Sequence, residues 1–328
     1  MTSPSILPQT GTFPRDHHPR LSAAAIMYRV MLATLPGVLL LLFFWGIGIG
    51  IQLLLAALTA LVCETLNAKL RQRSLTALDV ASGLLSALLL AIALPATAPW
   101  WVVASGTGFG LLIGKHVFGG VGMNIFNPAM VGFCAVYFSF PAAMSSYPGD
   151  YVPAAEVLAA IFPGAFEATI SPDALAAATT LTQFKIDGQW ADISSKTWLI
   201  SLAWLAGGAY LWHKHVADWR LSAGFLGGFF AAALLFWLSG YASLNPLQHA
   251  GAGALLFTAC FIVTDPTTAA TGRLGRWLFA LLAGVLALLI RQFSNMADSM
   301  AFAILLANTC APLIDSYTRP QYIRGQRQ

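Results

Sequence analysis

The sequence has 328 residues, of which 58% are hydrophobic and only 9% are charged, and its formal net charge is +4. Soluble domains carry about 25% charged residues, so this composition excludes a soluble enzyme of the same length. The basic residues are scattered in short segments between apolar runs, which excludes the concentrated basic face of a nucleic-acid-binding protein.

Long apolar runs predict the fold class. Asp, Glu, Lys and Arg are absent from residues 30–63, 80–114, 116–149 and 221–264, and each run exceeds the roughly 20 residues that cross a bilayer. Glycine and proline residues divide most of these runs in two. We therefore predict an all-α polytopic membrane protein with about ten transmembrane helices, two loops broken by Gly and Pro, and one long periplasmic segment. The helices are expected near residues 26–45, 48–66, 80–96, 99–116, 127–143, 196–213, 221–240, 248–264, 276–292 and 298–315.

Basic residues orient the predicted helices, because cytoplasmic loops carry an excess of Lys and Arg. With a cytoplasmic N-terminus, 14 of the 17 Lys and Arg residues fall on the inner side, and only Lys185, Lys196 and Arg291 on the outer side. Both termini are thus expected in the cytoplasm and residues 144–195 outside it, which is the periplasm if the chain lies in the inner membrane of a Gram-negative bacterium. The predicted parts of the chain are an N-terminal tail (1–25), a first membrane block (26–143), a periplasmic segment (144–195), a second membrane block (196–315) and a C-terminal tail (316–328).

Two loops interrupt the predicted helices with glycine, asparagine and proline. The first loop ends in Asn127-Pro128, which is typical of a helix N-cap followed by proline at the first helical position. Asp265-Pro266 in the second loop predicts another capped helix on the same side of the membrane. Two helix N-termini would offer N–H groups to a polar ligand, although two capped loops without a ligand are the simpler interpretation. The candidate ligand-binding residues are Gly119, Gly120, Asn124, Asn127, Asp265 and Thr267.

Ionisable and sulfur-containing side chains are few in the apolar segments. The ionisable ones near predicted helix ends are Glu64, Asp79, Lys115, Arg291, Asp298 and Asp315. Because charges are costly in lipid, most of them are expected at the membrane interface. Glu64 lies five residues before Lys69 in the second predicted helix, so a local ion pair is expected there. The four cysteines are widely spaced, which is typical of small buried side chains rather than metal ligands, and no metal site is predicted.

The predicted periplasmic segment contains a stretch rich in alanine and threonine, residues 173–185. Its composition alone predicts a surface loop or a short helix. Histidine and cysteine are both absent from residues 144–195, so catalysis by a nucleophile and a neighbouring base is not supported, and no catalytic residue is assigned.

Residues 119–130, 261–266 and 313–320 carry a resemblance to a known family. On these motifs the chain resembles the D subunit of the Rnf ferredoxin:NAD electron-transport complexes, which is related to the B subunit of the sodium-translocating NADH:quinone reductase. The resemblance covers nearly the whole chain, and the chain length is closer to that of the Rnf protein.

The resemblance implies a covalent flavin. Members of the family carry a flavin mononucleotide (FMN) joined by a phosphoester to a threonine, in the pattern Asp-x-x-Ser/Thr-Gly-Ala-Thr. Asp173, Ala178 and Thr179 match the Asp, Ala and acceptor Thr of this pattern, whereas Ala176 and Ala177 replace the Ser/Thr and the Gly. The implied acceptor is therefore Thr179, while the two replacements put the efficiency of flavin attachment in question. Thr180 and Thr182 are the weaker candidates.

The resemblance also implies partners and a second cofactor. The expected partners are a flavin transferase that attaches FMN, a second FMN-bearing subunit with a single span, and two small polytopic subunits that share an iron–sulfur cluster. A noncovalent riboflavin is implied in the membrane part, and the two broken loops are our candidates for its site. Electron flow between the flavin and iron–sulfur centres would be coupled to translocation of Na⁺ or H⁺. NAD or ferredoxin chemistry is not expected on this chain, which has no dinucleotide-binding pattern and no cysteine cluster.

Two alternatives remain open from the sequence. Helices broken by Asn-Pro and Gly in both halves are also typical of a stand-alone secondary transporter. A purely structural scaffold within a larger assembly is the third interpretation. Flavin bound to the purified chain would separate the first interpretation from the transporter, and unchanged activity of the complex after Thr179→Ala would indicate the scaffold.

Overall fold

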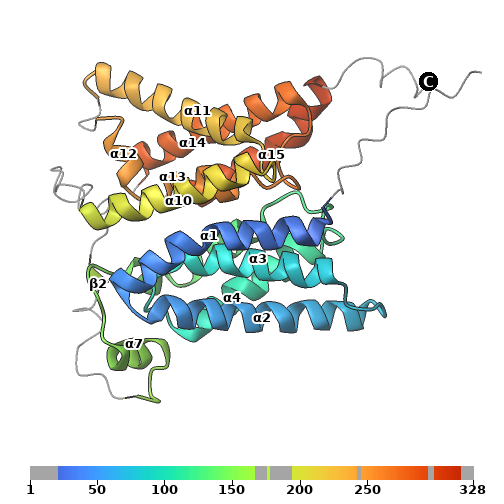
Figure 1. Ribbon diagram of the computed structural model, residues 1–328, viewed down its shortest axis with the longest axis vertical. Helices are drawn as coiled ribbons and strands as arrows, with labels where there is room; N and C mark the ends of the chain where they lie inside the picture. Colours follow the sequence, from blue (N-terminus) through green and yellow to red (C-terminus); the bar gives the residue numbers. More distant parts are fainter. Residues whose placement is uncertain (1–20, 167–175, 178–193, 242–244, 295–298, 319–328) are drawn as a thin grey trace, which may run out of the picture.

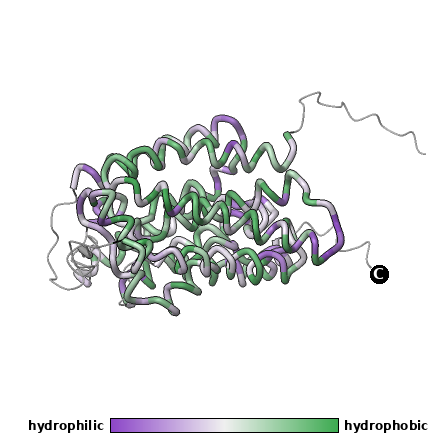
Figure 2. Tube along the Cα trace, turned by 90° about the horizontal axis from the view of Figure 1, so that it is seen from below, coloured by the Kyte–Doolittle hydropathy of each residue, from purple (hydrophilic) through white to green (hydrophobic). Residues whose placement is uncertain are grey.

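The computed structural model describes residues 21–166, 176–177, 194–241, 245–294 and 299–318. Most of these residues form helices, which fall into two groups along the chain (Figure 1). Buried side chains from both groups belong to one hydrophobic core. Hydrophobic residues follow the lengths of the helices, whereas hydrophilic residues gather mainly near helix ends and in loops (Figure 2), as expected of a multi-pass membrane protein.

The first group contains the helices of residues 23–145, drawn in blue to green in Figure 1. They are α1 (Ala23–Trp45), α2 (Gly48–Leu70), α3 (Ala77–Ala93), α4 (Trp100–Leu111), the π-helical turn η1 (Leu112–His116), α5 (Pro128–Ser139) and α6 (Pro141–Ser145). Helix α4 runs directly into η1, so the two form one continuous helical element.

The second group contains the helices of residues 195–318, drawn in yellow to red in Figure 1. They are α10 (Ser195–His213), α11 (Trp219–Leu238), α12 (Gln248–Gly251), α13 (Leu255–Phe257), the π-helical turn η2 (Thr258–Ile262), α14 (Arg273–Phe293) and α15 (Met300–Thr318). Both groups thus contain a π-helical turn directly before a loop, and such turns are frequent at functional sites.

The two groups contact each other through α1 with α10 and through α5 with α15. The α1–α10 contact is close because Gly207 lies against the backbone carbonyl of Ala33, where a Cβ atom would collide with the oxygen. Small residues at such positions let helix backbones approach in a membrane, where van der Waals packing drives association.

Five of the described helices are long and apolar enough to cross a membrane: α1, α2, α11, α14 and α15. Helices α3 and α5 are apolar but shorter. A helical element lies in each of the ten ranges named from the sequence, yet the count of ten membrane crossings stays a prediction.

Two of the ten predicted helices are interrupted rather than continuous. In the range 127–143, α5 ends at Ser139 and α6 begins at Pro141, because proline lacks the N–H that would continue the first helix. In the range 248–264, Ala252 is extended and Gly253 has a φ of +71°, so the chain breaks between α12 and α13. The sequence prediction placed one span in each range and did not include these breaks.

The two ends of the helices differ in their loops. At one end, the short strands β1 (Tyr147–Pro148) and β2 (Ala176–Ala177) pair antiparallel, and we call this the β2 end. Trp45 Nε1 donates to the Pro148 carbonyl at 2.7 Å, and the Tyr147 hydroxyl donates to the Ala93 carbonyl at 3.0 Å. Helix α7 (Ala154–Ile161) lies against α2 at the same end. The opposite end carries residues 117–127 and 263–272, and we call it the loop end.

Candidate functional site

Asn127 begins α5 as the sequence predicts. Its side-chain Oδ1 accepts hydrogen bonds from the amides of Ala129 and Met130, at 3.0 and 3.4 Å, and Pro128 occupies the first helical position. These bonds satisfy amides that have no partner within the helix. The predicted N-cap is confirmed, and only 3% of the Asn127 surface is exposed.

Asp265 caps a turn rather than a helix. Its Oδ1 accepts hydrogen bonds from the amide and the hydroxyl of Thr267, at 3.0 and 2.7 Å. The next helix, α14, begins only at Arg273. The prediction of a helix starting at Pro266 was wrong, because the Asp265 side chain closes a local turn of the kind that competes with helix formation.

The structure brings the two loops together, although they are far apart in the sequence. Asn127 Nδ2 lies 3.3 Å from Asp265 Oδ2, and Asn124 Nδ2 lies 3.5 Å from Thr267 Oγ1. Four of the six predicted loop residues therefore meet at one place on the loop end. Asn127 and Asp265 come from loops that each follow a π-helical turn.

Asn308 of α15 joins both loops, and sequence reasoning missed it. Its Oδ1 accepts the Asn127 amide at 3.2 Å, and its Nδ2 donates to the Thr268 carbonyl at 3.1 Å. Asn308 is fully buried. Burying an amide side chain in an apolar helix costs free energy unless the amide is hydrogen-bonded. An asparagine in a predicted membrane helix was therefore the sequence signal that could have identified Asn308.

Gly119 and Gly120 serve the turn that follows η1. Their φ angles are +118° and +107°, values that residues with a Cβ atom rarely adopt. Arg71, at the end of α2, donates to the carbonyls of His116 and Gly119 at 2.6 and 3.3 Å. These bonds hold the glycine turn against α2, and the structure gives it no hydrogen bond to the Asp265 turn.

A cavity of about 330 Å³ lies beside the joined loops. Its polar lining is made of amides, hydroxyls and one carboxylate, and it includes Asn124, Thr267, Thr268, Thr271, Asn308 and Asp315. Asp315 accepts hydrogen bonds from the amide and the hydroxyl of Thr271, at 2.9 and 3.0 Å. Apart from the Asp315 carboxylate, which already accepts two hydrogen bonds from Thr271, this lining offers neutral donors and acceptors to a small polar or aromatic ligand.

A buried ionic cluster lies between α2, α3 and η1. Lys115 Nζ lies 2.6 Å from Glu64 Oε1 and 2.6 Å from Ser82 Oγ, and His116 Nε2 lies 3.3 Å from Glu64 Oε2. The side chains of Glu64 and Lys115 are only 1% and 2% exposed. The expected local pair with Lys69 was wrong, because Glu64 faces α3 and η1 while Lys69 is exposed.

Arg291 is also buried within the protein. Its Nη1 donates to the Ala252 carbonyl at 3.3 Å, and its guanidinium lies 5.2 Å from the centre of the Phe229 ring. Asp298, a further residue expected at a helix end, lies outside the described residues.

The implied covalent flavin site lies largely outside the described residues. Asp173, Ala178 and Thr179 are not described, whereas the backbone of Ala176–Ala177 between them forms β2. The register pairs Ala177 with Tyr147 and Ala176 with Pro148. The described part of the predicted flavin motif is thus tied to the β2 end, the opposite end from the joined loops.

The four cysteines are free thiols, and Cys63, Cys134 and Cys260 are buried, as predicted for small apolar side chains. Within the described ranges, no three His, Cys, Asp or Glu residues are grouped as a metal site would need.

Comparison with known proteins gives the family. The model of the NQR2, RnfD, RnfE family matches residues 14–324. The D subunits of the ion-translocating oxidoreductase complexes of Salmonella typhi and Salmonella typhimurium are each 39% identical over 347 residues, covering 96% of this chain and 97% of the relative. The family model covers most of the chain and the similarity extends along nearly its whole length, so the chain belongs to the NQR2, RnfD, RnfE family.

Proposed function

We propose that the chain is the D-type membrane subunit of an ion-translocating oxidoreductase complex. The observation that carries the proposal is the 39% identity to the Salmonella D subunits, which extends over 96% of this chain and 97% of theirs. Coverage from end to end means that the relatives share the same membrane architecture. It favours a component of a complex over a stand-alone secondary transporter.

Within that complex, we propose that Thr179 carries FMN through a phosphoester bond. The sequence supports this through Asp173, Ala178 and Thr179, which match the attachment pattern. The β1–β2 pairing bears on where such a flavin would lie. Thr179 follows β2 by two residues, and two residues of chain reach at most about 7 Å, so a flavin bound there would stay at the β2 end.

Mass spectrometry and in-gel fluorescence test the attachment. The full chain, produced together with the flavin transferase, should show one fluorescent band after denaturation and one FMN on the peptide that contains Thr179. Thr179→Val should abolish the band, because valine has the shape of threonine without the hydroxyl. Thr182→Val is the matched control and should keep it; a band that survives Thr179→Val and vanishes in Thr182→Val would move the attachment to Thr182.

We further propose a noncovalent riboflavin in the cavity beside the joined loops. The cavity volume of about 330 Å³ lies at the lower end of the range of small-molecule sites. Its amide and hydroxyl groups match the uncharged carbonyls, ring nitrogens and hydroxyls of riboflavin. Asn124 and Thr267 would hold the ligand from the two loops, and Asn308 would keep those loops together. Asn124→Leu should lower the riboflavin extracted from the purified protein and leave covalent FMN unchanged.

In this proposal the isoalloxazine ring supplies the redox chemistry, while the protein positions it and excludes water. The two flavin positions lie at opposite ends of the helices. Helix α4 and η1, which run between these ends, contain the 17 residues 100–116, or about 25 Å of helix. The partner flavin and iron–sulfur subunits are proposed to connect the two ends, with coupling to Na⁺ or H⁺ translocation.

A further inference from the structure

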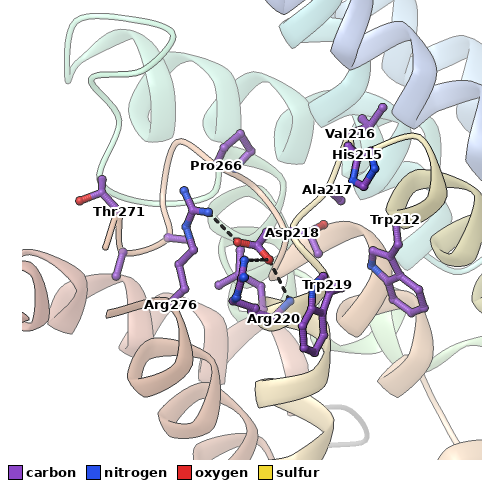
Figure 3. A pocket seen from close by; sticks show the side chains of 14 residues that line it. Trp212, His215, Val216, Ala217, Asp218, Trp219, Arg220, Pro266, Thr271 and Arg276 are labelled. Carbon is purple, nitrogen blue, oxygen red and sulfur yellow. Dashed lines mark hydrogen bonds and ion pairs between the residues drawn. The ribbon is translucent and has the colours of Figure 1, made fainter. Parts of the chain in front are cut away.

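A second and larger cavity, of about 560 Å³, opens at the loop end of the second helix group (Figure 3). It lies between the end of α10, the turn that leads into α11, the Asp265 loop and the first turn of α14. It shares only Ala269 and Thr271 with the cavity proposed for riboflavin. Nothing in the flavin proposal uses this cavity, so its role is a separate question.

The cavity wall carries more positive than negative charge. Asp218 Oδ2 lies 2.5 Å from Arg276 Nη1, and its Oδ1 accepts the Arg220 amide at 3.0 Å and lies 3.4 Å from Arg220 Nη1 (Figure 3). Burial alone would raise the pKa of Asp218, but the hydrogen bonds from the Arg220 amide and Arg276 outweigh it and lower the pKa. One ionised carboxylate therefore faces two guanidinium groups, each with five N–H donors, and a positive charge is left over.

The helix ends add to this positive charge. Both α11 and α14 begin at the cavity, and neither has an acidic residue in its first turn. The residue before α14 is Gly272, which has no side chain to cap the free amides, and the helix begins with the exposed Arg273. The N-terminus of a helix is already partly positive, so the arginines at this end repel it. A bound anion would be attracted both to the arginines and to the free amides of the helix end.

An aromatic side chain at the rim indicates the membrane interface. Trp219 is 52% exposed, and its ring meets Trp277 edge-on, with ring centres 5.8 Å apart. Residues Ala223, Leu226, Phe230 and Leu234 follow Trp219 at helical spacing, and none of them is buried. Trp219 therefore lies at the start of an apolar face of α11. Tryptophans are enriched at such positions, at the boundary between lipid headgroups and acyl chains.

We propose that this cavity binds the phosphate headgroup of an anionic membrane phospholipid, with Arg220 and Arg276 as its donors. The acyl chains would follow the apolar face of α11 below Trp219. Basic pockets between transmembrane helices on the cytoplasmic side bind anionic headgroups in other proteins, and the loop end is the end predicted to be cytoplasmic. A soluble phosphate shares the headgroup chemistry, but the apolar face beside the arginines favours a lipid.

Native mass spectrometry of the full chain in a neutral detergent tests the proposal. The chain is titrated with dioleoylphosphatidylglycerol, with dioleoylphosphatidylcholine and, in a third series, with phosphatidylglycerol in the presence of millimolar inorganic phosphate. We expect one tightly bound phosphatidylglycerol that phosphatidylcholine does not replace and that inorganic phosphate does not displace.

Two variants change the cavity charge in opposite directions. Arg276→Gln should weaken phosphatidylglycerol binding about fivefold, the effect of one basic residue near an anionic surface. Asp218→Asn should strengthen it by a similar factor, because asparagine still caps α11 but no longer neutralises the arginines. Lys69→Gln removes one charge from an exposed residue at the same end of the molecule and serves as the matched control.

Three results would overturn the proposal. Equal binding of phosphatidylcholine would show that the headgroup charge is not recognised. If Arg276→Gln and Lys69→Gln weakened phosphatidylglycerol binding equally and Asp218→Asn did not strengthen it, the lipid would be attracted by the charge of the whole loop end and not by this cavity. Displacement by inorganic phosphate would assign the cavity to a soluble phosphate instead of a lipid.

Discussion

The buried pair of Glu64 and Lys115 offers a quantitative test of the structure. Lys115→Met keeps the length of the side chain but removes the ammonium group that lies 2.6 Å from Glu64 and from Ser82. Because Glu64 is 1% exposed, water cannot replace the lost partner. Removing one member of a buried ion pair costs about 3–5 kcal/mol, and we expect the free energy of unfolding to fall by that amount.

Unfolding of the purified chain in mixed detergent micelles, followed by helix content, measures the loss. Lys69→Met is the matched control: Lys69 is exposed in the last turn of α2, and its replacement should change stability by less than about 0.5 kcal/mol.

A double-mutant cycle isolates the pair itself. Glu64→Gln combined with Lys115→Met removes both charges, and the double variant should recover at least about 2 kcal/mol relative to the sum of the single changes. If Lys115→Met were no more destabilising than Lys69→Met, or if the two changes simply added, the Glu64–Lys115 pair would not exist in the membrane.

Three further predictions follow from single contacts. Asn308→Leu should destabilise the chain by about 2–4 kcal/mol, since it leaves the Asn127 amide and the Thr268 carbonyl buried without partners; an effect below about 1 kcal/mol in the same unfolding assay would contradict the bridging role. Gly207→Ala should cost about 1–3 kcal/mol because its Cβ would strike the Ala33 carbonyl, whereas Gly227→Ala, with open space around it, should be neutral. Burial opposes ionisation of Asp218, but the hydrogen bonds that it accepts from Arg220 and Arg276 outweigh burial and lower its pKa. The ionised carboxylate therefore stabilises the fold at any pH above the ordinary carboxyl pKa, and this contribution to the free energy of unfolding is lost as pH falls through the lowered pKa. A pH series should therefore show an acid-side loss of stability that is smaller in Asp218→Asn; identical profiles would exclude this contribution.

Part of the fold and of the candidate site could be predicted from the sequence. The Asn127-Pro128 cap was predicted correctly because capping depends on residues within three positions of each other. Asp265-Pro266 has the same local pattern, yet it closes a turn, and α14 starts at Arg273. The two motifs share the capping residue and the proline, but Thr267 donates its hydroxyl to Asp265 and helps to close a local turn, whereas alanine stands at the same place after Asn127.

The composition and the charge-free runs by themselves determined that this chain is a membrane protein, because the cost of burying charge in lipid depends only on which residues are present and how far apart they stand. Only the tertiary structure decided which polar groups meet. Asn308 bonds to Asn127 across 181 positions, and Glu64 pairs with Lys115 across 51 positions rather than with Lys69 five residues away. The physical reason is that a buried polar side chain must find a partner wherever helix packing brings one within hydrogen-bond distance, and distance along the chain does not fix that packing.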